Sequence, residues 1–173
     1  MSDFKLSPSQ FAYAWNGCKR CYYYNVVEKI YAPFSLPKIF TQIDELQKDF
    51  FEGKSTHDID KSLPSGRVLF GERTVKSKPL KDEKSGNRVI ISGKTDCIVE
   101  FDDGTYGIVD FKTSNITSNK AKIYSRQLHA YAFALENAAD GFAKLSPITR
   151  LGLFVMEPTE LEQLHDGYYG LMS

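Results

Sequence analysis

The apolar residues in the first part of the chain recur at a helical spacing. Ser7, Pro8 and Gln10 indicate a helix start, because serine caps helices, proline suits the first helical position and glutamine can close a capping box. We expect residues 17–21 to end this helix. The aromatic and β-branched run over residues 22–31 fits either a strand or a helix.

A second helix is expected to start near Ser35, with Pro37 in its first turn, and to run toward Gly53 and His57. Its apolar positions recur at the spacing of one helix face. They are Ile39, Phe40, Ile43, Leu46 and Phe50. Residues 63–66 then form a loop rich in turn-forming residues.

The pattern after this loop changes to that of β-strands. The predicted strands cover residues 68–70, 72–80, 88–101, 105–113 and 148–156. One helix, over residues 119–137, separates the last two strands, and its apolar positions include Ile123, Leu128, Ala132 and Leu135. Helices on both sides of a run of strands predict an α/β sandwich with a mixed sheet.

Length and charge narrow the picture further. A chain of 173 residues fits one domain better than two. We expect a single domain, 1–173, with a helical N-terminal part at 1–66 and a catalytic core at 67–173. Lysine plus arginine equals aspartate plus glutamate at 22 each, so any binding to nucleic acid requires a local basic surface.

Targeting signals are not evident in the sequence. No apolar run approaches the ~20 residues needed to span a bilayer, so we expect no membrane partner. Residues 1–10 are too polar for a signal peptide. Three cysteines form no disulfide framework, which indicates a reducing, intracellular and therefore cytoplasmic setting and fits a viral or prokaryotic origin.

The most informative segment is a hairpin with the turn Asp102-Asp103-Gly104. Loops of this length commonly end in a left-handed residue, a position that glycine suits. Such a turn pairs Phe101 with Thr105. Counting back along both strands then places Asp96 directly opposite Asp110.

Two carboxylates that face each other across neighbouring strands repel unless a cation lies between them. Lys112 is two residues past Asp110 and therefore shares its face, while Phe111 points to the other side. Two adjacent carboxylates suit a hard divalent ion such as Mg²⁺ or Mn²⁺, and a lysine beside the ion suits phosphodiester hydrolysis. The alternative interpretation is a solvated cluster of charges on a surface hairpin.

Several short motifs follow one another along the chain. They are Gly53/His57, Gly93/Asp96, Asp110/Lys112 and Gln127/Tyr131, after Leu6-Ser7-Pro8-Ser9 and the cysteine-aromatic stretch 18–24. This series resembles the PD-(D/E)xK nuclease superfamily, and within it the RecB-type branch that includes CRISPR-associated exonucleases. The resemblance implies a restriction-endonuclease-like α/β fold, with a central mixed β-sheet flanked by helices.

The resemblance also implies roles for single residues. His57, Asp96, Asp110 and the Phe111 carbonyl would bind Mg²⁺ or Mn²⁺, and Lys112 would be the catalytic lysine. Gln127 and Tyr131 would support the site, and their spacing does place them on one helix face. Without the motif, His57 would be interpreted as an ordinary surface histidine. The implied partner is DNA, as single strands or ends; nothing in the sequence identifies a protein partner.

The cysteines depart from the family pattern. Many relatives hold an iron–sulfur cluster through one N-terminal cysteine and three near the C-terminus, and no cysteine follows Cys97 here. We therefore expect no iron–sulfur cluster within this chain. Cys18 and Cys21 are half a metal site or, more simply, two free thiols near a helix end. The chain also ends soon after the last strand, which fits a compact form or a fragment.

The sequence thus favours a metal-dependent deoxyribonuclease, an exonuclease or nickase of DNA processing, repair, recombination or phage and CRISPR systems. Two other functions compete with it. One is a catalytically silent nucleic-acid-binding module of the same fold, against which the intact Asp96, Asp110 and Lys112 argue. The other is a structural metal-binding subunit that uses Cys18 and Cys21. Glu72 is a weaker candidate for an accessory acid.

Overall fold

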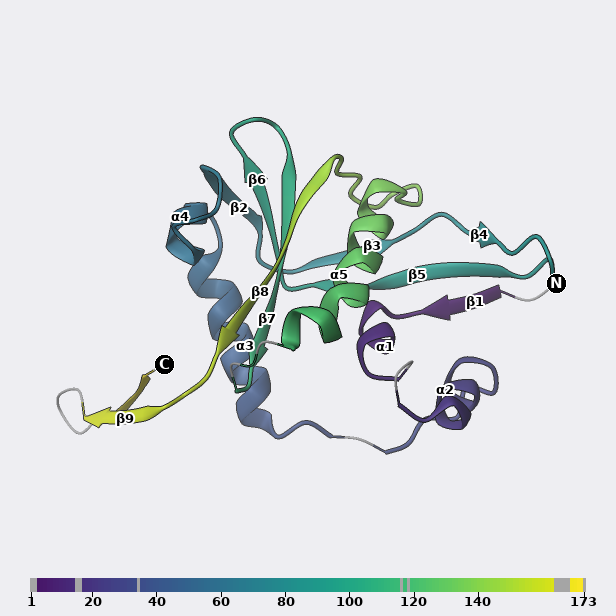
Figure 1. Ribbon diagram of the computed structural model, residues 1–173, viewed down its shortest axis with the longest axis horizontal. Helices are drawn as coiled ribbons and strands as arrows, with labels where there is room; N and C mark the ends of the chain where they lie inside the picture. The colour runs from purple at the N-terminus through teal and green to yellow at the C-terminus, as the bar shows by residue number, and fades with distance from the viewer. Residues whose placement is uncertain are drawn as a thin grey trace.

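Two four-stranded sheets meet near the centre of the molecule, and one of them extends to the N-terminal end (Figure 1). The computed structural model describes residues 3–14, 17–33, 35–115, 117, 119–163 and 169–172, the last range for its backbone alone. Strand β5 (Arg88–Thr95) belongs to one sheet, and strand β6 (Cys97–Phe101) belongs to the other. Asp96 is the only residue between these two strands, so it lies where the sheets meet.

The sheet that carries the hairpin has the order β2-β6-β7-β8. β2 (Gly66–Phe70) and β7 (Tyr106–Thr113) are antiparallel to β6, and β8 (Ile148–Met156) is parallel to β7. This sheet is mixed, as the sequence predicts. The connection from β7 to the parallel strand β8 runs through a long helix, which is the usual way to join parallel neighbours.

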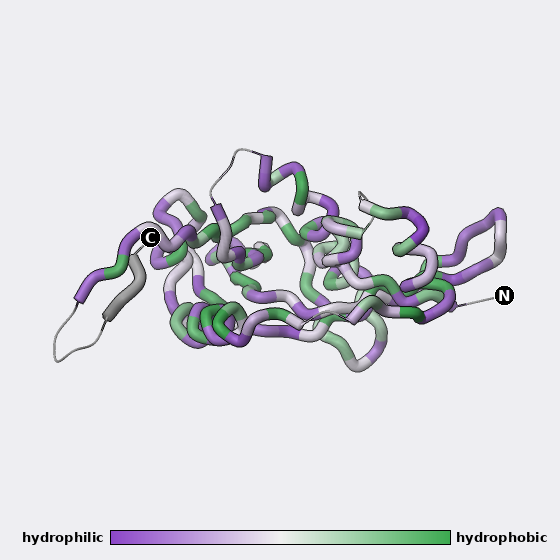
Figure 2. The backbone as a smooth tube through the Cα atoms, turned by 90° about the horizontal axis from the view of Figure 1, so that it is seen from below, coloured by the Kyte–Doolittle hydropathy of each residue, from purple (hydrophilic) through white to green (hydrophobic). Residues whose placement is uncertain are grey.

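In the second sheet, β5 pairs with three short strands. β1 (Asp3–Leu6) is parallel to β5, whereas β3 (Arg73–Lys76) and β4 (Leu80–Lys81) are antiparallel to it. A separate two-stranded sheet pairs β9 (Glu160–Gln163) with β10 (Tyr169–Met172). Figure 2 shows the turn between β4 and β5 as mostly hydrophilic.

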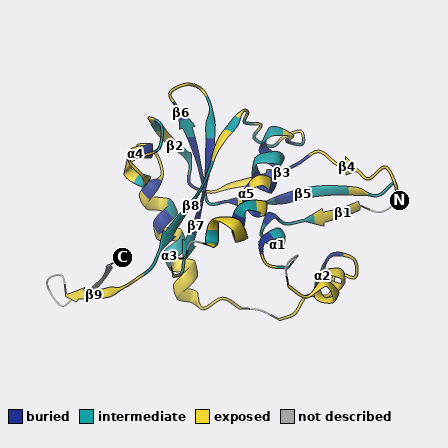
Figure 3. Cartoon of the chain, in the orientation of Figure 1, coloured by how far each residue is buried: buried dark blue, intermediate teal, exposed yellow. Residues whose placement is uncertain are grey.

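The described helices cover these sheets. They are α1 (Pro8–Ala12), α2 (Lys19–Val26), α3 (Lys38–Phe51), α4 (Thr56–Ile59) and α5 (Lys120–Glu136). Leu128 and Leu135 of α5 are buried in one core cluster with Ile98 and Ile108 of the hairpin. Phe111 is buried in the second cluster, on the α3 side of the sheet. Burial is therefore greatest in the central strands (Figure 3).

The register of the hairpin is confirmed. The Phe101 amide donates a hydrogen bond to the Thr105 carbonyl at 2.8 Å, and Cys97 pairs with Val109. Continuing this register by one residue places Asp96 opposite Asp110. Gly104 has a φ of 80°, so the left-handed residue lies where the turn length predicts it. Cys97 is buried, as its alternation with Asp96 indicates.

Several predicted elements agree with the structure. The capping box of Ser7 and Gln10 is present at α1, and β8 covers residues 148–156. Asn119 and Asn137 are the residues that flank α5 at its two ends. The run 22–31, which fitted strand or helix, begins inside α2 and continues past the end of that helix at Val26; Trp15 lies outside the described residues.

Other expectations need correction. The predicted second helix ends at Phe51, because the left-handed Gly53 interrupts it, and His57 lies in the separate helix α4. The predicted strand 72–80 is two short strands, and residues 88–101 divide at Asp96. The N-terminal strand β1 was not predicted. None of the described helices is both long and apolar enough to cross a membrane.

Candidate active site

Asp96 and Asp110 are brought together at the junction of the two sheets. The Asp96 Oδ2 atom accepts a hydrogen bond of 2.9 Å from the Phe111 amide on the neighbouring strand β7. Asp110 is 1% exposed, although it carries an ionisable side chain. A carboxylate that is buried this deeply needs partners, because its charge loses its hydration.

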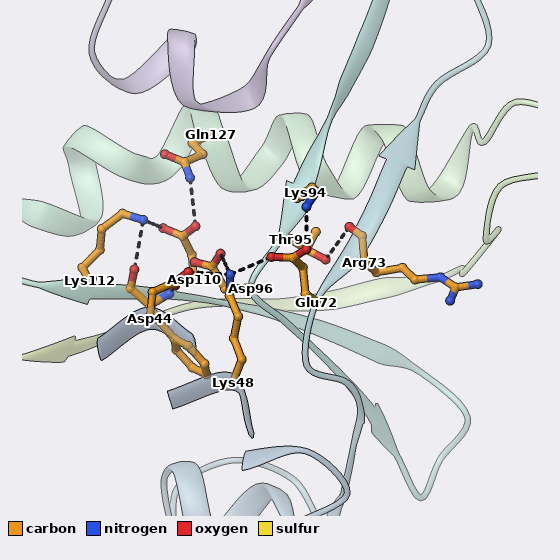
Figure 4. Close-up of polar contacts among 11 residues, drawn as sticks. Asp44, Lys48, Glu72, Arg73, Lys94, Thr95, Asp96, Asp110, Lys112 and Gln127 are labelled. Atoms are coloured by element: carbon orange, nitrogen blue, oxygen red, sulfur yellow. Dashed lines mark hydrogen bonds and ion pairs between the residues drawn. The ribbon is translucent and has the colours of Figure 1, made fainter. Parts of the chain in front are cut away.

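Asp110 finds its partners on α5 and on its own strand (Figure 4). Gln127 donates from Nε2 to Asp110 Oδ1 at 2.8 Å, and the Lys112 ammonium forms an ion pair with Oδ2. Burial raises the pKa of Asp110 to about 7, against the opposing effect of Lys112. The neighbouring carboxylate of Asp96 raises the pKa further, since like charges disfavour ionisation.

Lys112 lies between two oxygen atoms. Besides Asp110 Oδ2, its Nζ atom donates to the Phe111 carbonyl oxygen at 3.1 Å. The same ammonium lies 5.0 Å from the ring centre of Tyr124, which is within the range of a cation–π contact. The Tyr124 hydroxyl is hydrogen-bonded to that of Tyr13. The aromatic ring and the two oxygens together fix the position of the ammonium.

Helix α3 adds two charged residues that the sequence analysis missed. Lys48 Nζ lies 2.7 Å from Asp44 Oδ2, 2.9 Å from Glu72 Oε2 and 3.7 Å from Asp96 Oδ1. Burial alone would lower the pKa of Lys48, but the hydrogen bonds to Asp44 and Glu72 raise it above its usual value. In the sequence, Asp44 and Lys48 have the spacing of an ordinary surface pair, which gives no signal for a site.

The accessory acid proposed from the sequence, Glu72, lies at the edge of this site. Its Oε1 atom pairs with Lys94 Nζ at 2.8 Å, and its Oε2 atom pairs with Lys48. Lys94 and Lys48 lower the pKa of Glu72. Glu72 is therefore held in place by two cations, one of which is Lys94 of β5.

His57 is not brought to the two aspartates. It lies in α4, which packs on β2, and its Nε2 atom is 3.1 Å from the Leu63 carbonyl oxygen. Across the ranges that the structure describes, no group of three or more His, Cys, Asp or Glu side chains is arranged to hold a metal. The expected trio of His57, Asp96 and Asp110 is thus not assembled in this arrangement.

Tyr131 lies behind the site on α5, four residues after Gln127. Burial, together with the charges of Asp110 and Asp96, raises the pKa of Tyr131. Its ring also lies against Gly93 of β5, where a Cβ atom would be 3.4 Å from Tyr131 Cε1 and 2.8 Å from Pro8 Cδ. The glycine that the motif contains is therefore required by the close packing of α1 and α5 on β5.

The oxygen atoms present fit a hard divalent cation. Asp110 Oδ2 and the Phe111 carbonyl already converge on a positive charge, the Lys112 ammonium. The Asp96 carboxylate is close enough to raise the pKa of Asp110. Carboxylate and carbonyl oxygens are the ligands that Mg²⁺ and Mn²⁺ prefer. The donor set therefore suits the metal expected from the sequence at Asp96, Asp110 and Phe111.

Cys18 and Cys21 lie far along the chain from these groups, at the start of α2. The Cys18 sulfur caps the helix by accepting a hydrogen bond of 3.3 Å from the Cys21 amide. Both thiols are free and exposed. The hydrogen bonds with Cys21 lower the pKa of Cys18.

Comparison with the models of known protein families gives a match. The family model of the PD-(D/E)XK nuclease superfamily matches residues 55–166, which is more than half of the chain. The matched range contains the hairpin, α5 and β8. Searches of curated proteins and of solved structures gave no match.

Proposed function

The chain belongs to the PD-(D/E)XK nuclease superfamily, and on this premise we propose that it is a divalent-metal-dependent nuclease that hydrolyses DNA phosphodiester bonds. The observation that carries the proposal is the arrangement of Asp96, Asp110 and Lys112. Two carboxylates adjoin a lysine whose ammonium lies between Asp110 Oδ2 and a backbone carbonyl. A solvated surface cluster would not bury Asp110 to 1% exposure.

Asp96, Asp110 and the Phe111 carbonyl would hold the metal ion, either Mg²⁺ or Mn²⁺. Such an ion polarises a phosphate oxygen and lowers the pKa of bound water. Both carboxylates are oriented by the protein itself, Asp110 by Gln127 and Asp96 by the Phe111 amide. This orientation avoids reorganisation during the reaction. His57, which belongs to the motif, stays a proposed ligand that would have to approach from α4.

Lys112 supplies positive charge at the reacting phosphate. Its ammonium is held by the Tyr124 ring on one side and by oxygen atoms on the other. In this position it stabilises the negative charge that develops on the phosphate oxygens, or it orients the attacking water. Gln127 is a positioning residue that acts through Asp110, and Tyr131 packs behind both.

Labelled DNA incubated with Mg²⁺ or Mn²⁺, with and without EDTA, tests the proposed function. We expect cleavage that EDTA abolishes and that Asp110→Asn reduces by at least ~10²-fold, a typical loss for an electrostatic group in an active site. Asp102→Asn, in the exposed turn of the same hairpin, is the matched control and should cut normally. DNA binding without cleavage under every metal condition would instead support a silent binding module.

Nucleases differ in whether they cut single or double strands, and ends or internal bonds. By resemblance to RecB-type nucleases, we propose that the enzyme acts on single strands or DNA ends during DNA processing. Circular and linear DNA, each single- and double-stranded, separate the alternatives. Cleavage of linear DNA with circular DNA left intact supports an exonuclease, whereas relaxation of supercoiled circles supports a nickase.

A further inference from the structure

Three carboxylates surround the ammonium group of Lys48 (Figure 4). The distances from Nζ are 2.7 Å to Asp44, 2.9 Å to Glu72 and 3.7 Å to Asp96. The Lys48 side chain is 12% exposed, so the group is largely shielded from water. An ammonium has three donors and no acceptor, which matches a setting of three anionic oxygen atoms.

These residues come from different parts of the fold. Asp44 and Lys48 are on α3, Glu72 lies between β2 and β3, and Asp96 joins β5 to β6. The remaining oxygen of Glu72 is paired with Lys94, whose side chain is 64% exposed. Lys48 is therefore the largely shielded cation that holds three separate segments around Asp96, and Lys94 is an outer partner of Glu72.

The two carboxylate oxygens of Asp96 point to different partners, one to a backbone amide and the other to an ammonium. Oδ2 accepts the Phe111 amide on the Asp110 side, whereas Oδ1 is directed to Lys48. Nucleases with two metal ions place them ~3.5–4 Å apart around shared oxygen ligands. In this protein the position for a cation on the Oδ1 side of Asp96 is taken by a covalently attached ammonium.

We propose that Lys48 is a built-in second cation of the active site, so that the protein binds a single divalent ion, on the Asp110 side of Asp96. This inference rests on the proposed function, because it assumes that Asp96 and Asp110 hold a metal. Lys48 acts through Asp96 and is a positioning residue. It compensates the charge of Asp44, Glu72 and Asp96 where a second ion would otherwise bind.

Calorimetric titration with Mn²⁺ tests the proposal without an activity measurement. The wild-type chain should bind one Mn²⁺. Lys48→Met keeps the length of the side chain and removes its charge. Without the ammonium, Asp44, Glu72 and Asp96 should draw closer together and bind a second ion in its place. Electron paramagnetic resonance of the loaded variant should then show two magnetically coupled Mn²⁺ ions. Thermal melting confirms that each variant is folded.

Matched variants separate this effect from a general change of charge. Lys94→Met removes a cation that contacts Glu72 at the rim of the site, and it should still bind one ion. Lys48→Arg keeps the positive charge and should also bind one. Lys48→Met combined with Glu72→Gln should return to one ion. If Lys48→Met does not fold, Lys48→Gln, which retains two donors, serves in its place.

The outcomes distinguish the two proposals. Two ions bound by the wild-type chain overturn the inference about Lys48. One ion bound by both the wild type and Lys48→Met overturns it as well, and it leaves the metal-dependent nuclease intact. No Mn²⁺ bound by any variant, together with no cleavage of DNA, contradicts the proposed function itself.

Discussion

Asp110 combines deep burial with opposing electrostatic neighbours. Burial and the nearby Asp96 favour the protonated form, whereas Lys112 favours the ionised form. The net result is a pKa of about 7, raised from 3.8. A carboxyl group whose pKa rises on folding stabilises the native state while it is protonated in that state. That contribution is present at pH values below about 4 and is lost as the pH rises through about 7.

The metal-free protein should therefore become less stable as the pH rises from 4 to 7, through the ionisation of Asp110. Asp110→Asn removes this group, so its free energy of unfolding should depend less on pH over the same window. Urea denaturation in EDTA at several pH values measures the effect. Asp102→Asn should follow the wild type. Parallel curves for Asp110→Asn and the wild type would show that Asp110 does not titrate in this range.

Lys112 is expected to contribute to the cleavage step but not to the binding of DNA or metal. An ammonium is no ligand for a cation, so Lys112→Ala should lose a large part of the cleavage rate, ~10²–10³-fold, and keep its affinity for DNA. Metal affinity should be retained or should rise, because a nearby positive charge repels the ion. Single-turnover cleavage at saturating Mg²⁺ and DNA binding in Ca²⁺ measure the two properties. Lys81→Ala, on the short strand β4, is the control. Cleavage by Lys112→Ala at the wild-type rate would show that Lys112 is not a catalytic residue.

At the scale of elements, the hairpin and α5 could be predicted because local rules determine them. The length of the turn at 102–104 fixes the pairing, and the pairing places Asp96 opposite Asp110. The orientation of α3 could not be predicted in this way. Its apolar positions Phe40, Leu46 and Phe50 are exposed, and its polar residues Asp44 and Lys48 face the site. Tertiary contacts with charged groups far along the chain decide this orientation.

Strand β5 packs so closely against Pro8 of α1 that there is no room for a side chain at Gly93. A Cβ atom at Gly93 would lie 2.8 Å from Pro8 Cδ, closer than real contacts allow. Gly93→Ala should therefore force α1 away from β5 and cost about 1–3 kcal/mol, a typical cost of overpacking. Chemical denaturation measures the loss. Gly152→Ala on β8 is the control, because its nearest neighbours would be 3.9 Å away. Equal stability of both variants would mean that α1 adjusts without cost.

For the whole molecule, a net charge of zero means that DNA must find a local basic surface. Lys94 lies on the face of the active site, and Lys120 and Lys122 lie in the first turn of α5. Contacts with phosphates release counterions, so binding weakens as salt rises. The dependence of binding on salt is measured as the slope of the logarithm of the DNA-binding constant against the logarithm of the salt concentration. Replacing Lys120 and Lys122 together with alanine should reduce the size of this slope by about 0.7–0.9 for each phosphate that is no longer neutralised. Alanine at Lys81 and Lys84, beside the turn before β5, is the control, and an unchanged slope for the α5 pair would place the DNA elsewhere.

The single residue between β5 and β6 gives the junction of the two sheets a mechanical role. Asp96 follows the last residue of β5 and precedes the first residue of β6, and Asp110 lies within β7. The Phe111 amide of β7 holds the Asp96 carboxylate beside Asp110, so the end of β5 is tied to the other sheet at this point. A divalent ion held by both acids would add a second link between the end of β5 and β7. The pair of side chains proposed to hold the metal would thus also join the two sheets, and metal binding should raise the melting temperature of the protein.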